Sequence, residues 1–223
     1  MEVPMTKKPN YRFSGHETFP CRYAWLPKAV MAIQRSPGIL SDENEAMVEL
    51  GVGKNMVRAI RFWATASGVA ENCGRDGWKT TPFGKALLGE GGLDPYLEDT
   101  QTLWLLHWKL ATQFQEPLFA WDYLLNRWHD PEITRSAALV AFDKEATQLG
   151  RKLSRTTLKH HFDTFIHTYV PTRGSKPSVM EDSLDCPLVE INLIENVGER
   201  TVADGGVRRE PVFAFRREEK PEI

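Results

Sequence analysis

The chain has 223 residues, of which 41% are hydrophobic, and its 28 Lys and Arg residues nearly balance its 30 Asp and Glu residues. This composition is typical of a soluble globular protein of one or two domains. The sequence shows no secretory signal and no apolar run long enough to span a bilayer. The three cysteines are odd in number and form no CxxC pair, which favours a reducing cytoplasm and argues against a zinc ribbon or a disulfide framework.

Charge is unevenly distributed along this near-neutral chain, so any contact with nucleic acid is expected to be local. Residues 1–35 carry 6 basic and 2 acidic side chains, whereas residues 91–150 carry 4 basic and 9 acidic ones. The ends of the chain are therefore better candidates for a DNA surface than its middle.

We expect residues 1–37 to form a loose arm followed by a helix that starts near Pro20, kinks at Pro27 and ends near Arg35. The adjacent His16 and Glu17 have two interpretations. They could perform acid–base or metal chemistry, or His16 could be a buried, hydrogen-bonded residue that locks the N-terminal segment onto the core. The second interpretation is favoured, because no other metal-ligand pair stands at a suitable spacing.

Residues 38–90 predict a winged helix-turn-helix. Ser41 is a good N-cap for a first helix, which ends at Gly51-Val52-Gly53, and a second helix runs from about Lys54 to Ser67. A hairpin with Arg75 at its tip follows, and Thr81-Pro82 opens a short closing helix.

The outer face of the second helix is cationic, because no acidic residue lies between Glu49 and Glu71. Such a face suits a helix in a DNA major groove, although a basic face can also be merely solvated. The predicted DNA contacts of this unit are Lys54, Asn55, Arg58, Arg61, Thr65 and Arg75.

Residues 91–130 predict two strongly apolar helices that form a central aromatic helical hub. A stripe of aromatic side chains could stack nucleobases, but this one stands in acidic surroundings without interleaved Arg or Lys. We therefore interpret these residues as core. They include Leu103, Trp104, Leu106, Trp108, Leu110, Phe119, Trp121, Tyr123 and Trp128.

Residues 131–223 predict a C-terminal helix-turn-helix plus hairpin unit. One helix is expected from Asp130-Pro131 to about Leu149, with Val140 among its inward residues, and Ser154 caps the next helix. Strands are expected at 187–194 and 211–216. The unit is either a second winged helix or a helical hairpin covered by a sheet. The start of the second helix carries a second set of predicted DNA contacts, namely Arg151, Lys152, Arg155 and Lys159.

Catalytic and cofactor motifs are absent from the sequence, which contains no phosphate loop, dinucleotide fingerprint, nucleophile elbow or HExxH. His160, Asp163 and His167 could share one helix face as a metal site, but their spacing matches no strong ligand motif. We therefore expect no catalytic residue, no metal and no cofactor.

Five sequence blocks, in order, resemble one prokaryotic family, the domain-of-unknown-function family numbered four thousand and seven. The blocks are FSGHETFPCRYAWL, LGVGKNMVRAIRFWA, TPFGKALLG, GLDPYLEDTQTLWLLHWKLA and DCPLVEINLI, and together they extend from about Tyr11 to Phe215. One departure is Ala24, where the family usually has glycine. The resemblance implies a genetic setting, beside genes for DNA sulfur modification (phosphorothioation) and other anti-phage defence functions, and it implies no established activity.

The sequence as a whole predicts a mainly α fold with short antiparallel β-hairpins. Its function is expected to be that of a cytoplasmic, non-catalytic subunit or adaptor that binds double-stranded DNA in a DNA-modification or defence system. Expected partners are duplex DNA and the proteins of that system, with a homodimer as a further candidate assembly. The alternatives are a protein–protein scaffold that holds a modification or restriction enzyme without contacting DNA and, as a minor one, a metal-dependent nuclease.

Overall fold

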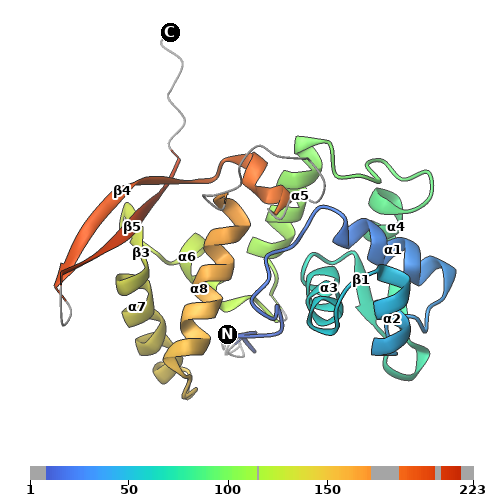
Figure 1. Cartoon of the computed structure of the whole chain (residues 1–223), viewed down its shortest axis with the longest axis horizontal. Helices are drawn as coiled ribbons and strands as arrows, with labels where there is room; N and C mark the ends of the chain where they lie inside the picture. The colour runs from blue at the N-terminus through green and yellow to red at the C-terminus, as the bar shows by residue number, and fades with distance from the viewer. Residues whose placement is uncertain (1–8, 115, 172–185, 204–206, 217–223) are drawn as a thin grey trace, which may run out of the picture.

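The computed structural model describes residues 9–114, 116–171, 186–203 and 207–216 (Figure 1). In these ranges the chain forms eight α-helices and two small antiparallel sheets, one of two strands and one of three. The predicted combination of helices with small antiparallel hairpins is therefore confirmed. None of the helices in the described ranges is both long and apolar enough to cross a membrane.

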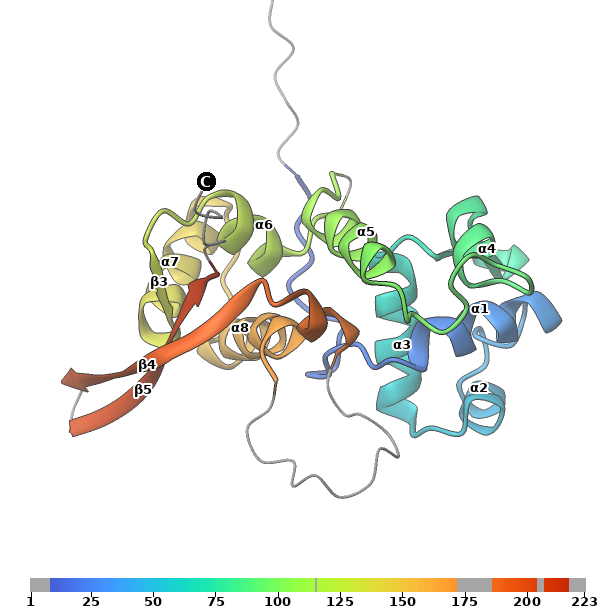
Figure 2. The same ribbon diagram turned by 90° about the horizontal axis from the view of Figure 1, so that it is seen from above.

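The elements divide into a group before residue 90 and a group after it. The first group consists of α1 (Trp25–Arg35), α2 (Glu43–Leu50), α3 (Lys54–Ala66), β1 (Ala70–Asn72), η1 (Gly74–Asp76), β2 (Trp78–Thr80) and α4 (Pro82–Leu88). The second consists of α5 (Thr100–Ala111), α6 (Phe119–Asn126), β3 (Glu132–Thr134), α7 (Arg135–Gln148), α8 (Arg155–Tyr169), η2 (Pro187–Ile191), β4 (Ile194–Ala203) and β5 (Val207–Phe215). Seen from above, α8 lies between the β4–β5 hairpin and the first group (Figure 2).

The first helix begins later than the sequence predicted. α1 starts at Trp25, so Pro27 lies in its first turn and not in the interior of a longer helix. A backbone N–H in the first turn has no partner within the helix, and proline therefore costs nothing at this position. The expected kink at Pro27 is thus unnecessary.

The N-cap of α2 also differs from the prediction by one residue. The Asp42 carboxylate accepts hydrogen bonds from the amides of Asn44 (2.7 Å) and Glu45 (3.0 Å), whereas Ser41 lies outside the helix. We expect Asp42→Ala to lower the free energy of unfolding by about 1 kcal/mol, as is usual for the removal of an N-cap. Urea unfolding measures the loss, and Ser41→Ala is the control, with little change expected. An equal loss in both variants would contradict the assignment.

The turn between α2 and α3 uses glycine where the backbone needs it. Gly51 adopts the left-handed conformation, with φ of 66°, and ends α2. After α3, β1 and β2 pair antiparallel from Ala70 with Thr80 to Asn72 with Trp78. The chain here therefore runs helix, turn, helix, hairpin, helix, in the predicted order.

The C-terminal group differs more from its prediction. Residues 132–134 form β3 before α7 begins, and Thr134 caps that helix. The inward face of α7 is formed by Ala138, Leu139 and Phe142, whereas Val140, expected inside, is exposed. Residues 187–191 are a 3-10 helix instead of a strand, and the three-stranded sheet has the order β3-β5-β4.

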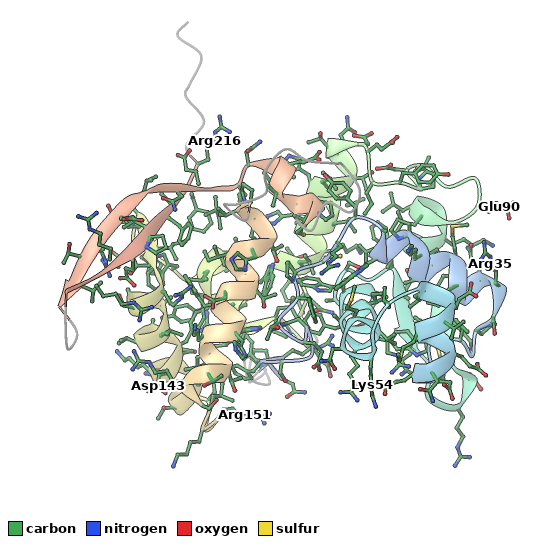
Figure 3. All side chains as sticks on the ribbon, in the orientation of Figure 1. Arg35, Lys54, Glu90, Asp143, Arg151 and Arg216 are labelled. Atoms are coloured by element: carbon green, nitrogen blue, oxygen red, sulfur yellow. The ribbon has the colours of Figure 1, made fainter. Side chains whose placement is uncertain are left out.

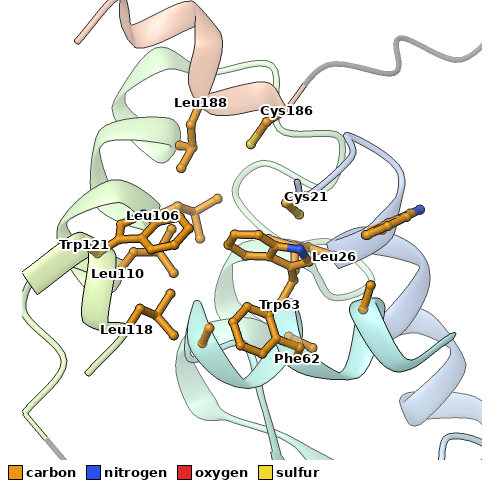
Figure 4. Packing of buried hydrophobic residues seen from close by; sticks show 14 of the residues in the cluster. Cys21, Leu26, Phe62, Trp63, Leu106, Leu110, Leu118, Trp121, Cys186 and Leu188 are labelled. Atoms are coloured by element: carbon orange, nitrogen blue, oxygen red, sulfur yellow. The ribbon is translucent and has the colours of Figure 1, made fainter. Parts of the chain in front are cut away.

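One continuous cluster of buried apolar residues extends from Cys21 to Phe213 and joins the two groups. Its largest fully buried members are Trp63 of α3 and Trp121 of α6, whose rings meet edge to face at 5.8 Å (Figure 4). The hub prediction holds for Phe119 and Trp121, which are fully buried. It is wrong for two tryptophans on the outer face of α5, because Trp104 is 45% and Trp108 57% exposed.

Candidate nucleic-acid interface

The first two turns of α3 form an open, basic helix end. Gly53 occupies the N-cap position and offers no side chain to the first backbone amides, while Lys54, Asn55 and Arg58 are exposed. Uncapped amides and the helix dipole both favour an anion at such an end. The predicted contacts therefore lie where a phosphate group can reach them.

Glu43 gathers the basic side chains of α3 around one carboxylate. Lys54 Nζ lies 3.0 Å from Glu43 Oε2, and Arg58 Nε and Arg61 Nη1 lie 2.7 and 3.7 Å from Oε1. Hydrogen bonds from Arg58 and Lys54 lower the pKa of Glu43 to about 2, so it remains ionised. Lys54, Arg58 and Arg61, here called the α3 basic cluster, share this one carboxylate. The cluster together with Glu43 therefore keeps a net positive charge.

The second half of α3 is covered by the N-terminal segment. Phe62 is buried beneath the guanidinium of Arg12 and the ring of His16. Thr65 accepts a hydrogen bond from Arg12 Nη1 (3.4 Å) and is half-buried, and Arg61 is the least exposed cation of the cluster. The accessible part of α3 is thus narrower than the sequence indicated.

His16 is buried in a network with α8, which confirms that it locks the N-terminal segment onto the core. Ala120 N–H donates to His161 Nε2 (3.0 Å), so neutral His161 donates through Nδ1 to His16 Nε2 (3.2 Å). The Thr164 hydroxyl (3.1 Å) and the Thr18 amide (3.1 Å) both lie within hydrogen-bond distance of His16 Nδ1. Burial, together with the nearby charge of His160, lowers the pKa of His16 to about 4. His16 and His161 thus form a buried, hydrogen-bonded contact between the N-terminal segment and α8.

The hairpin between α3 and α4 presents another of the predicted DNA contacts, Arg75. Arg75 is exposed in the 3-10 turn that joins β1 to β2. In the same turn, Asp76 lies 3.6 Å from the ammonium group of Lys79. Arg75 therefore projects from the hairpin tip as a positive side chain beside an internally balanced pair.

The four basic residues predicted at the start of α8 are all exposed. Ser154 caps this helix as expected, its hydroxyl accepting from the Thr157 amide (3.0 Å). Arg151 Nη2 contacts Asn10 Oδ1 (3.3 Å). Figure 3 shows Arg151 and Lys54 along the same lower edge of the molecule, so the two predicted patches face one side in this view.

Three further cations join Arg155 and Lys159 around a pocket of about 510 Å³ that α7, α8, β4 and β5 enclose. They are Arg135, Arg208 and Arg209. The sequence analysis did not assign these three to a site. Arg208 and Arg209 are recognisable as a basic pair near a turn, but only the position of the β4–β5 hairpin beside α7 and α8 brings them to this place.

One of the three candidate metal ligands on α8, Asp163, forms an ion pair. Asp163 is engaged by Arg135, whose Nε and Nη2 both lie 2.9 Å from Asp163 Oδ1. Throughout the ranges that the structure describes, no three His, Cys, Asp or Glu side chains gather in a way that could hold a metal ion. The described residues do not form a donor set for magnesium or zinc.

Comparison with known proteins gives one family and one group of similar structures. The model of the family described as a protein of unknown function, DUF4007, matches residues 13–223. Two crystal structures of SspB are similar to this chain, one of them magnesium-bound, with TM-scores of 0.77 and 0.76 and identities of 30% and 29%. Each alignment covers 93% of this chain and 60% of SspB, so the chain spans less than two thirds of that protein. No curated protein matches the chain.

Proposed function

Because this chain belongs to the DUF4007 family and carries an open basic helix end, we propose that it is a duplex-DNA-binding, non-catalytic subunit. Its setting would be a DNA sulfur-modification or anti-phage defence system, in which it would act as an adaptor that presents DNA to the enzymes. The observation that carries the proposal is the α3 basic cluster, in which three cations share a single carboxylate beside uncapped helix amides.

The arrangement of residues 41–89 supports a winged helix-turn-helix as the DNA-binding unit. In that motif, the second helix enters the major groove through its N-terminal residues, and a β-hairpin contacts the neighbouring backbone. Here α3 is the second helix, its N-terminal end is exposed, and Arg75 lies at the hairpin tip. Since the N-terminal segment covers Phe62 and Thr65, groove contacts would come from Lys54, Asn55 and Arg58.

The start of α8 would supply a second contact to the same duplex. Arg151 and Lys54 lie along one edge of the molecule (Figure 3), and Lys152 is exposed next to Arg151. Two separated basic patches on one side suit a rod-like polyanion, whose phosphates continue beyond the reach of a single helix. A homodimer would extend this surface further.

Glu43 makes the proposal sharply testable, because it competes with DNA for the same cations. We expect Lys54→Ala with Arg58→Ala to weaken binding of a labelled duplex about tenfold, and to reduce the slope of log affinity against log salt by about 0.9 for each phosphate that the protein no longer neutralises. Glu43→Gln should raise the affinity for duplex DNA, since it removes the negative charge that Lys54 and Arg58 now contact. Fluorescence anisotropy between about 50 and 200 mM salt measures both effects.

Arg35→Ala is the matched control for these variants. Arg35 pairs with Glu49 at 3.3 Å on an exposed surface, and Figure 3 places it at the right-hand edge, away from Arg151 at the lower edge. Its removal costs one positive charge and should leave the affinity nearly unchanged. The proposal fails if the wild-type protein does not bind duplex at low salt, or if Arg35→Ala weakens binding as much as the α3 variants do.

A protein–protein scaffold is the second candidate, and the outer face of α5 favours it. Trp104, Leu105 and Trp108 are exposed together at helical spacing, and aromatic side chains of this kind are enriched at protein interfaces. A scaffold that never touches DNA would bind a modification or restriction enzyme regardless of Glu43 and Arg58. Trp104→Ala with Trp108→Ala would weaken that complex and leave the duplex affinity unchanged.

A further inference from the structure

The pocket between α7, α8 and the β4–β5 hairpin contains a dense group of positive charges. Its five cationic residues come from three separate parts of the chain, and its apolar lining consists of Leu139, Val202 and Pro211. In Figure 1, α7 and α8 lie side by side beneath the hairpin, which forms one wall. The cationic residues are Arg135, Arg155, Lys159, Arg208 and Arg209.

One acidic residue, Glu210, also lines the pocket, and its carboxylate is engaged by neighbouring groups. Glu210 accepts hydrogen bonds from Ser136 N and Oγ (3.0 and 2.5 Å) and from Arg200 Nε (3.0 Å). These bonds lower its pKa in spite of its partial burial, so Glu210 stays ionised and balances Arg200. Arg135 is bound by Asp163. The carboxylates of this region are therefore satisfied without the remaining pocket cations.

Four cations thus line the pocket without a carboxylate partner in the part of the chain that the structure describes. They are Arg155, Lys159, Arg208 and Arg209. Like charges held around one concavity repel one another, and a bound polyanion relieves that repulsion. Guanidinium groups also match phosphate oxygens in geometry, since each can donate two parallel hydrogen bonds.

We propose that this pocket binds a nucleoside di- or triphosphate. A polyphosphate concentrates several negative charges within the reach of the cations that α8 and β5 bring to the pocket, whereas a duplex presents its phosphates along an extended convex backbone. The volume of about 510 Å³ lies within the range of small-ligand sites, and the apolar lining offers a surface for the sugar and base. The hydroxyl groups of Ser136 and Thr156 complete a polar rim.

This inference goes beyond the proposed DNA binding and does not require it. The pocket shares Arg155 and Lys159 with the predicted α8 patch, but Arg208 and Arg209 belong to the pocket alone. Nucleotide binding can therefore be measured without DNA, and duplex binding can be measured without nucleotide. A negative result for nucleotide binding therefore leaves the DNA-binding proposal unaffected, and the reverse also holds.

The test is isothermal titration calorimetry of the full chain with ATP, ADP, AMP and pyrophosphate, at low salt and in EDTA. We expect ATP to bind more tightly than ADP, and ADP more tightly than AMP, because affinity follows the charge that the four cations meet. Pyrophosphate should bind less tightly than ADP, since it lacks the groups that contact the apolar lining. Lys159→Gln with Arg208→Gln should weaken ATP binding at least tenfold.

Lys144→Gln is the matched control, because Lys144 is exposed on α7 outside the pocket, and its ATP affinity should equal that of the wild type. Lys159→Arg keeps the charge and should retain binding, which separates the removal of a cation from a disturbed fold. The inference is overturned if ATP does not bind at millimolar concentration, or if the double variant binds it like the wild type. It is also overturned if the double variant affects duplex binding only, which would make the pocket part of the DNA surface.

Discussion

Trp121→Ala is expected to lower the free energy of unfolding by about 3–5 kcal/mol, the usual range for truncating a buried tryptophan. The Trp121 side chain is fully buried and contacts Trp63 of the first group at 5.8 Å. Its Nε1 donates a hydrogen bond to the hydroxyl of Tyr169 on α8 (3.1 Å). The substitution therefore removes apolar contacts and also leaves a buried hydroxyl without one partner.

Urea denaturation followed by circular dichroism measures this loss, and Trp108→Ala is its control. Trp108 belongs to the same residue type and lies on the neighbouring helix α5, but it is 57% exposed. Its truncation should cost less than about 1 kcal/mol, in the range of surface substitutions. If the two variants lost similar amounts of unfolding free energy, the assignment of Trp121 to the centre of the core and of Trp108 to the surface would be contradicted.

Acidification from pH 6.5 to pH 4 is expected to destabilise the protein through the His16–His161 pair. Burial lowers the pKa of His161 well below its ordinary value, and that of His16 falls to about 4. Between pH 4 and 6.5 the unfolded chain therefore binds more protons than the folded one, so stability decreases as the pH falls. From His16 alone the loss is about 2 kcal/mol at pH 5 and about 3 kcal/mol at pH 4.

The matched experiment compares urea unfolding of wild type, His16→Gln and His129→Gln across this pH window. His16→Gln is expected to be less stable at pH 7, because it disturbs the buried network, and to lose less stability on acidification. His129 is exposed, and its substitution should leave the pH dependence unchanged. The Glu43 carboxylate contributes in a different window, below pH 4.5, because its pKa is lowered to about 2. An unchanged pH dependence in His16→Gln would contradict the buried-neutral assignment.

The N-terminal segment joins the two halves of the molecule, which explains why His16 matters for stability. Arg12 N donates to Pro117 O (3.0 Å), and Phe119 N donates back to Arg12 O (3.1 Å). A few residues later, His16 contacts α8 while Gly15 packs against Phe62 of α3. The segment thus holds the α3 basic cluster in a defined position relative to α8.

Local features of this chain were readable from the sequence because they depend on near neighbours. Val57, Ile60 and Trp63 recur at helical spacing, which places them on one face of α3, and all three are buried. On α8, apolar residues from Leu158 to Tyr169 recur at the same spacing and are likewise buried, and Ser154 caps that helix as expected. Capping and periodicity act within one or two turns, so a single sequence contains them.

Only the tertiary structure decided how these elements cover one another. An apolar period cannot distinguish Trp121, which is buried, from Trp108, which is not, because burial depends on which element packs against each face. The charge pattern of the sequence likewise does not show which charged residues from distant positions lie together. Glu43 of the preceding helix pairs with the basic residues of α3, a stretch that has no acidic residue of its own. Arg155 lines the same pocket as Arg208, which belongs to a strand more than fifty residues later. The sequence by itself determined the helices and their basic residues, whereas long-range packing determined which cations are balanced and which remain open to a ligand.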